Sequence, residues 1–555
     1  MAVPVEKASL PLYRPAKPLP FELVQHVGIF FEEKLHTQAL SLLLNSLSSH
    51  ADVSTPTFIP SPQHLALAAT FLVHPSTTAR PKTTEEEEAP NVSLRLLRLV
   101  NSLVGPTNAK CDTAFVFTHF ETSRHGRRRH ADDAVPSEGR KQLNLDRDID
   151  IDLAQSASIW SRAEDFWHAV GWAFNCSVLH PARWERWRVW LEFMCEVLED
   201  DWNERLSRED NEPSKEAKKA KKAEEKQGLA GSMIVQYINS SGAGFGRNRR
   251  ILRSIFADGG TSSVNEFREV FHNEVKLSRK KPSKEKDTKK REAVVDIEAD
   301  EYADFYLSSD DDTSSSTGGR ESKRPRRSKA VTKRSATSTL KSNTDSLPNP
   351  ILPFAALGDT TSLALRQRLL QLLSTVSEAL PQHLMDLQDL YHLFVEFIRP
   401  LPLPIYQCFI SPFALPHFST AAQTTLCEFL LFRLRETAAP DTPEDYLSQS
   451  KLETCFLPYA TATSSLSDNA KMSITLEALL VLLAESNMLV ITEDTKRLTQ
   501  MGIIRRAEKA QYETRKNQLA RMSEDMEWSW LSESAERLRF LVEEVIPGDS
   551  GSSGS

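Results

Sequence analysis

Residues 158–202 read SIWSRAEDFWHAVGWAFNCSVLHPARWERWRVWLEFMCEVLEDDW, and this stretch holds seven of the nine tryptophans in the chain. Its apolar side chains recur at helical spacing on both sides of His180 and Pro181, and a proline suits the first turn of a new helix. The apolar stripe of the first half is Trp160, Ala163, Trp167, Val170, Phe174 and Val178, and that of the second half is Trp184, Trp187, Leu191, Met194, Leu198 and Trp202. The pattern predicts a helical hairpin whose tryptophans form a buried core.

A nucleic-acid interface is the alternative use for this hairpin, because arginines beside aromatic rings bind single strands by stacking and phosphate contact. The arginines expected on its polar face are Arg183, Arg186 and Arg188. Acidic residues that would repel phosphates lie close by in the sequence: Glu185, Glu192, Glu196, Glu199, Asp200 and Asp201. Non-specific contact with nucleic acid is better expected from the lysine runs at 215–226 and 279–291.

The composition of the whole chain indicates several domains separated by polar segments. Its 555 residues exceed what one hydrophobic core usually supports, whereas only 40% of residues are apolar and 26% are charged. Part of the chain is therefore expected to be disordered. The net charge of -8 gives no overall attraction to nucleic acid or to an anionic membrane, so such binding would need local patches.

The six cysteines are scattered, form no CxxC pair and mostly lie among apolar residues, which favours small buried thiols in a reducing compartment. No apolar run reaches the roughly 18 residues that a membrane-spanning helix needs. The first 20 residues are rich in proline, unlike a signal peptide. A soluble intracellular protein is expected.

Helical periodicity continues through most of the chain, and alternating strand patterns are limited to AFVF (114–117) and MLVI (488–491). We therefore expect an all-α fold, an irregular α-solenoid or multi-helix body in two lobes with long disordered insertions. No fixed-period repeat supports a regular helical array, and no resemblance to a known family is specific enough to name.

Three local patterns make further predictions. A single helix is expected from Phe21 to Leu47, and a solvated loop over residues 76–90. Ser263 and Glu266 have the spacing of a helix-starting capping box.

The connecting segments are expected from shifts in composition. From the N-terminus, we expect an extended segment (1–20), an N-terminal helical domain (21–207) with a disordered insertion (118–150), a basic linker (208–228), a helical segment (229–277), a disordered charged connector (278–348), a C-terminal helical domain (349–546) and a flexible tail (547–555). The connector alternates basic, acidic and basic blocks, which bury too little apolar surface to offset chain entropy.

No catalytic motif stands in a suitable context, so no catalytic residue and no cofactor is expected. Gly242, Gly244 and Gly246 resemble a phosphate-cradling loop. The flanking sequence lacks the strand–loop–helix unit and the lysine–serine ending that such loops need, and a flexible turn is favoured.

The spacing of Arg162 and His168 resembles that of helical ribonucleases of the HEPN class. The resemblance implies an acid–base role for His168 and stabilisation of a developing phosphate charge by Arg162. A solvated or hydrogen-bonded histidine explains the same short motif. A zinc set can be drawn from His168, Cys176, His180 and Cys195. Its spacing fits no common zinc finger, which favours core packing.

KRPRRSK (323–329) resembles a monopartite nuclear import signal, and KKPSKEKDTKKR (280–291) supplies a second basic cluster. An extended basic segment of this kind binds along acidic pockets of an import receptor. The residues expected to make these contacts are Lys323, Arg324, Arg326, Arg327 and Lys329. Nuclear localisation is therefore expected.

VVDIEADE (294–301) lies between the two basic blocks and resembles a SUMO-interacting motif. Val294, Val295 and Ile297 would add a strand to a sheet edge, while the acids that follow pair with a basic rim. Ser308 and Ser309 precede three aspartates and are expected phosphorylation sites.

These features predict a non-enzymatic helical scaffold or interaction subunit of a nuclear complex, acting in DNA repair, replication or chromosome maintenance. A ribosome-biogenesis or RNA-processing factor would share the basic clusters, and a HEPN-like ribonuclease is the alternative from another class. The expected partners are other protein subunits, SUMO and, non-specifically, nucleic acid. No membrane partner and no metal is expected.

Overall fold

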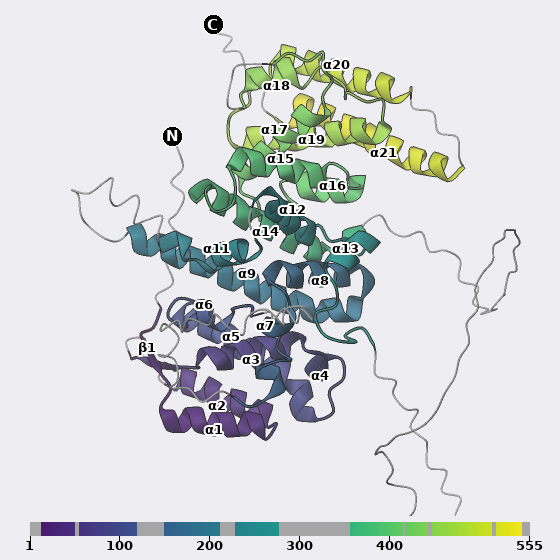
Figure 1. Cartoon of the computed structure of the whole chain (residues 1–555). Helices are drawn as coiled ribbons and strands as arrows, with labels where there is room; N and C mark the ends of the chain where they lie inside the picture. Colours follow the sequence, from purple (N-terminus) through teal and green to yellow (C-terminus); the bar gives the residue numbers. More distant parts are fainter. Residues whose placement is uncertain are drawn as a thin grey trace, which may run out of the picture. The chain divides into compact units, whose positions relative to one another are not determined.

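The chain is all-α over the residues that the computed structural model describes, as the periodicity predicted (Figure 1). The described residues are 13–49, 55–118, 149–210, 228–242, 244–276, 356–414, 417–441, 447–512 and 518–546. Those up to residue 276 and those from residue 356 belong to one compact unit.

The helices fall into a set before the connector and a set after it. The first set is α1 (Phe21–Glu32), α2 (His36–Ser48), α3 (Pro62–Val73), α4 (Pro75–Thr78), α5 (Thr84–Val104), α6 (Cys111–Ala114), the 3-10 helix η3 (Asp152–Ala154), α7 (Ile159–Arg162), α8 (Phe166–Leu179), α9 (Pro181–Asp210), α11 (Met233–Ser240), α12 (Phe245–Ile255) and α13 (Thr261–Glu266). The second set is α14 (Thr360–Ala379), α15 (Leu387–Ile398), α16 (Leu403–Ile410), α17 (Thr420–Leu434), α18 (Gln449–Cys455), α19 (Leu466–Glu485), α20 (Glu493–Ala510), α21 (Gln518–Phe540) and the π-helix η5 (Leu541–Val545).

The described residues also contain one parallel strand pair, β1 (Ala16–Pro18) and β2 (Thr57–Ile59), with Ala16 opposite Thr57. Neither strand coincides with the two short strand candidates, 114–117 and 488–491. Short apolar runs do not distinguish a strand from the buried end of a helix, and Ala114 ends α6.

Many helices begin at a serine, threonine or aspartate whose side chain accepts a backbone N–H of the first turn, a donor that helix geometry leaves free. These N-cap residues include Ser61 (α3), Thr83 (α5), Ser158 (α7), Asp165 (α8), Asp359 (α14), Ser419 (α17), Ser448 (α18), Ser465 (α19) and Thr492 (α20). Asp165 also accepts hydrogen bonds from Arg250 at 2.5 Å and Ser241 at 2.8 Å. One cap therefore ties α8 to the α11–α12 region.

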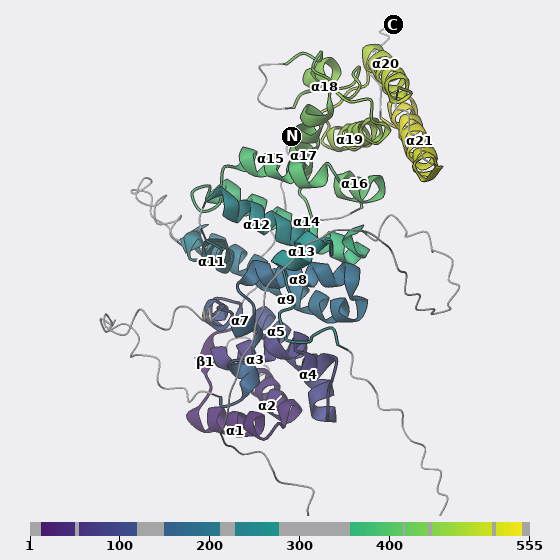
Figure 2. The same ribbon diagram turned by 45° about the vertical axis from the view of Figure 1, so that its right-hand side comes forward.

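The helices pack largely on near neighbours in the sequence, in a succession that Figures 1 and 2 show from two sides. α1 packs on α2, α2 and α3 pack on α5, and α3 also contacts α9. α8 packs on both α9 and α12, while α14 contacts α9, α12 and α15. α17 and α21 both pack on α19. The helices before and after the connector therefore share one core through α14.

Arg366 on α14 is a polar element of that shared core. Its guanidinium is wholly buried and donates to the carbonyl oxygens of Ile255 at 2.5 Å and Ala257 at 2.9 Å. Ile255 is the last residue of α12, where backbone carbonyls lack helical partners and attract a cation. The ring of Phe174 lies 4.1 Å below the guanidinium. Burial lowers the pKa of Arg366 to about 9.

The predicted tryptophan hairpin is confirmed as α8 and α9, and all seven tryptophans are buried. Trp160 differs in lying on the separate short helix α7, because the chain between α7 and α8 is extended around Asp165, the α8 cap. Trp172 and Trp190 lie outside the predicted apolar stripes but are equally buried. Helix α8 is covered by α9, α12 and α13, so more than one face is enclosed.

The single helix expected from Phe21 to Leu47 is instead α1 and α2. Helix α1 ends where Lys34 adopts a left-handed conformation with φ 61°. The N–H of Lys34 then donates to the Phe31 carbonyl, and that of Leu35 to the Phe30 carbonyl, which is the paired arrangement of a Schellman motif. A glycine usually occupies this left-handed position. Because a lysine occupies it here, the end of α1 could not be predicted from the sequence.

Two other local expectations were also wrong. Helix α5 begins at Thr84, inside the expected loop of residues 76–90, because Thr83 caps it and glutamates in its first turn suit the positive end of the helix. Ser263 does not cap a helix but donates to Asn175 at 2.7 Å, and Glu266 pairs with Arg253. Both side chains therefore bond to residues outside α13 instead of to each other's backbone, as a capping box would require.

Candidate functional site beside a buried ion pair

The functional residues predicted from the sequence lie outside the described residues. This applies to the import residues Lys323, Arg324, Arg326, Arg327 and Lys329, to Val294, Val295 and Ile297, and to Ser308 and Ser309. These assignments remain predictions. Among the described residues, a polar network and the pocket next to it are the strongest candidates for a site.

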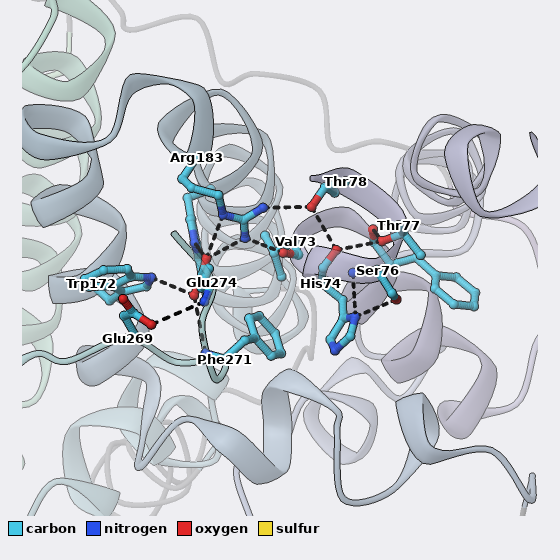
Figure 3. A network of polar contacts seen from close by, with 12 residues as sticks. Val73, His74, Ser76, Thr77, Thr78, Trp172, Arg183, Glu269, Phe271 and Glu274 are labelled. Atoms are coloured by element: carbon cyan, nitrogen blue, oxygen red, sulfur yellow. Dashed lines mark hydrogen bonds and ion pairs between the residues drawn. The ribbon is translucent and has the colours of Figure 1, made fainter. Parts of the chain in front are cut away.

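The network is centred on Arg183 and Glu274, whose side chains are 6% and 0% exposed (Figure 3). Arg183 lies in the first turn of α9, and its Nε donates to Glu274 Oε1 at 2.9 Å. Two further donations from Arg183 reach the Thr78 hydroxyl at 2.7 Å and the Val73 carbonyl at 2.5 Å. The guanidinium thereby joins the C-terminal end of α3, α4 and the segment that follows α13.

The Glu274 carboxylate accepts hydrogen bonds from the tryptophan hairpin. The indole N–H groups of Trp172 and Trp187 donate to its two oxygens at 2.9 and 2.5 Å, and the backbone N–H of Phe271 donates at 3.3 Å. A buried charge is tolerated when its hydrogen-bonding capacity is filled in this way. Arg183 was expected on the polar face of the hairpin beside Arg186 and Arg188. It is instead buried, because it pairs with Glu274 in the segment after α13. The helical periodicity of the hairpin gives no information about that distant segment.

His74 and Ser76 link this network to α4. The Nδ1 atom of His74 accepts the backbone N–H of Ser76 at 3.2 Å and lies 2.7 Å from the Ser76 hydroxyl (Figure 3). The ring meets Phe271 edge-on, with 4.8 Å between centroids. Burial, followed by the nearby cations Arg183, Arg80 and Arg162, lowers the pKa of His74 to about 4. His74 is therefore neutral near pH 7.

A pocket of about 330 Å³ opens next to His74. Its lining residues come from three parts of the chain: His74, Pro75, Ser76, Arg80 and Lys82; Ala157 and Arg162; Phe271 and His272. Among the described residues, the lining contains three cationic side chains, two histidines and no carboxylate. We call it the cationic pocket.

The cations of this pocket differ from other arginines of the same region. Arg98, Arg205 and Arg250 each pair with a carboxylate at 3.2 Å or less. The side chains of Arg80, Lys82 and Arg162 take part in no ion pair or hydrogen bond with the residues that the structure describes. Unpaired like charges around one cavity repel each other and favour an anion inside it.

The Arg162–His168 pair of the HEPN resemblance is divided by the structure. Arg162 lines the cationic pocket, whereas His168 is 5% exposed and does not line it. The Nδ1 atom of His168 accepts the Glu164 backbone N–H at 3.2 Å, and burial is the main cause that lowers its pKa. The histidines near Arg162 are His74 and His272, which come from other segments. Nothing in the local sequence linked them to Arg162.

Other sequence candidates take structural roles. Gly242 and Gly244 have positive φ and form the turn between helices α11 and α12, so a helix and not a strand leads into them. Across the described residues, no group of three or more His, Cys, Asp or Glu side chains is placed to hold a metal ion. Cys176 and Cys195 are buried free thiols.

A second pocket, of about 530 Å³, lies among α15, α17 and α19. Its cations are Arg399, Arg433 and Lys471, and it also contains Glu396 and Asp468. Arg399 lies 3.5 Å from Asp468, and Lys471 donates to the Arg399 carbonyl at 2.6 Å. Mixed, internally paired charge makes this pocket a weaker candidate for binding an anion.

Comparison with known proteins does not assign the chain to a family. No protein-family model matches the chain, and no curated protein matches it closely enough to count as a relative. In the described part of the chain, none of the helices combines the length and apolar character needed to cross a bilayer.

Proposed function

We propose that the chain is a non-enzymatic helical scaffold subunit of a nuclear complex that acts in DNA repair, replication or chromosome maintenance. The observation that carries the scaffold role is the use of buried charge. Arg183, Glu274 and Arg366 are almost wholly enclosed, and each bonds to groups of distant segments. Such bonds hold helices in fixed register, which suits a platform for other proteins.

The nuclear part of the proposal rests on the sequence. Lys323, Arg324, Arg326, Arg327 and Lys329 form the expected import segment, and Val294, Val295 and Ile297 the expected segment for SUMO or a similar partner. The proposal of a role on chromatin instead of in RNA processing likewise rests on the sequence.

Affinity purification of the tagged full-length chain tests the scaffold function. We expect other subunits to copurify in fixed ratios after a high-salt wash, and their identity distinguishes a chromosome-maintenance complex from a pre-ribosomal particle. A chain that purifies alone under gentle conditions would contradict the scaffold role.

A nuclease assay tests the rival enzyme class. We expect neither the wild-type chain nor His168→Ala to cleave single-stranded RNA, since His168 is buried and Arg162 lines a pocket that His168 does not reach. Cleavage by the wild-type chain that His168→Ala abolishes would establish the ribonuclease instead.

A further inference from the structure

We propose that the cationic pocket binds a phosphorylated serine or threonine side chain of a partner protein. The proposal rests on the scaffold function, because it names the chemistry by which one partner is held. It concerns a different part of the chain from the import and SUMO segments.

The charge of the pocket fits a phosphate monoester. Arg80, Lys82 and Arg162 supply three positive charges, and the described residues that line the cavity include no carboxylate to neutralise them. A phosphoserine or phosphothreonine carries about -1.5 to -2 charges at pH 7 and three acceptor oxygens, and guanidinium groups bind such oxygens in pairs. The ordinary carboxylates of Asp and Glu carry less charge and fewer acceptors, so they would bind more weakly.

The rest of the lining fits the carbon part of such a side chain. Pro75, Ala157 and Phe271 give the cavity an apolar portion, against which a methylene or methyl group can pack. A volume of about 330 Å³ admits one modified side chain with part of its backbone. His74 stays neutral and does not add to the charge, whereas His272 is exposed at the pocket and is free to approach a ligand.

The surroundings of the pocket disfavour a nucleic acid. Residues 85–88 are four consecutive glutamates in the first turns of α5, three positions after Lys82. Glu86 accepts the backbone N–H of Lys82 at 2.6 Å, so acidic groups border the pocket. A continuous polyanion would have to pass these carboxylates, whereas a single phosphorylated side chain needs only the cavity.

Part of the pocket wall is anchored to the buried ion pair. His74 and Phe271 line the pocket and also contact the Arg183–Glu274 network through Thr78 and the Phe271 backbone. This part of the wall is therefore held in place before a ligand binds, which lowers the ordering cost of binding.

Retention of the full-length chain on immobilised peptide libraries tests the proposal. One library carries a fixed phosphoserine or phosphothreonine in a degenerate sequence, and its partner carries serine or threonine. We expect the phosphorylated library to retain at least about tenfold more protein. The double variant R80A/R162A should lose this preference, and millimolar inorganic phosphate should compete for it.

The matched control is K496A/R497A, which removes two charges from the exposed surface of α20. It should bind like the wild-type chain. If R80A/R162A unfolds at a lower temperature, Arg162→Gln alone serves as the second variant, because Arg162 is exposed and its side chain has no described partner to lose.

Four outcomes would overturn the proposal. They are equal retention on both libraries, a preference that survives R80A/R162A and Arg162→Gln, binding of inorganic phosphate without binding of any phosphopeptide, and tighter binding of a short single-stranded RNA that the same variants abolish. Copurification of subunits tests the scaffold separately, so either proposal can fail while the other stands.

Discussion

Arg183 and Glu274 are separated by 91 positions in the chain and form an ion pair that solvent hardly reaches. The pair lies where the tryptophan hairpin, the end of α3 and the segment after α13 meet. The ion pair therefore depends on the packing of all three parts, and its disruption tests that packing directly.

Glu274→Gln should lower the free energy of unfolding by about 3–5 kcal/mol, because the buried Arg183 charge would lose its counter-charge while its desolvation cost remains. Urea unfolding followed by tryptophan fluorescence measures the change, since the nearby indoles report on this region. The matched control is Arg249→Ala, which breaks the exposed pair with Glu396 and should cost less than about 1 kcal/mol. Similar losses of unfolding free energy in both variants would show that the buried pair stabilises the fold no more than an exposed pair does.

Gly171→Ala should be destabilising by about 1–3 kcal/mol, because a Cβ at this position would lie 2.3 Å from the ring of Phe267 and force it to move. Gly246→Ala is the matched control, since nothing lies within 4 Å of its Cβ position in α12. There the change should raise stability by up to about 1 kcal/mol through helix propensity. Thermal unfolding compares the two variants, and a stable Gly171→Ala protein would contradict the close contact between α8 and Phe267.

Stability should fall as the pH is lowered from about 6.5 to 4, in part through His64. Burial lowers the pKa of His64 from 6.5 to about 4, so between these values the unfolded chain binds the proton that the folded chain excludes. The contribution is complete above pH 6.5 and amounts to about 3 kcal/mol.

His64→Gln should make this pH dependence shallower, because glutamine does not titrate and its side-chain oxygen can replace Nδ1 as acceptor of the Ser61 N–H. Part of the slope should remain, since the pKa of His74 is lowered to a similar value. Denaturant unfolding at a series of pH values provides the measurement. The exposed His26 gives the control, His26→Gln, whose slope should match the wild type. Equal slopes in all three proteins would rule out the role of His64.

Nuclear localisation should depend on the basic segment at 323–329. Replacing Lys323, Arg324, Arg326 and Arg327 by alanine should shift a fluorescent fusion toward the cytoplasm, because the contacts with acidic receptor pockets are lost. The comparison is K496A/R497A, which changes charge elsewhere. An unchanged distribution after removal of both basic clusters would leave nuclear import without support.

A peptide of residues 290–313 should bind SUMO with micromolar affinity, since ordering an extended segment opposes the burial of three aliphatic side chains. NMR titration should show shifts at the sheet edge of SUMO, and phosphorylation of Ser308 or Ser309 should tighten binding modestly. Shifts that persist in Val295→Ala with Ile297→Ala would indicate charge attraction alone.

Helical spacing was enough to predict the all-α class and the buried tryptophans, because each apolar stripe is a local property of the chain. It did not predict that Trp172 and Trp190 are enclosed as well, since that depends on helices packed on the opposite face. The end of α1 escaped prediction for a similar reason. Lys34 adopts a backbone conformation that a glycine would have signalled.

The candidate site could not be assembled from the sequence. His74, Arg162 and His272 come from three separate segments, and only the packing of α4, α7 and the turn after α13 brings them to one pocket. The sequence pattern pairs Arg162 with His168, which is close in the sequence but does not line the pocket. Arg183 was expected on the polar face because it lies off the apolar stripe, whereas the structure buries it against Glu274.

The position of Arg366 also bears on what happens when the backbone is cut. Its bonds to Ile255 and Ala257 join parts of the protein that precede and follow residues 277–355. A protease that cleaved this intervening stretch once would produce two polypeptides that remain associated through their common interior. Two cleavages would release the signals predicted there and leave the helical body assembled. Removal of the proposed import segment would therefore leave the helices on both sides of it joined.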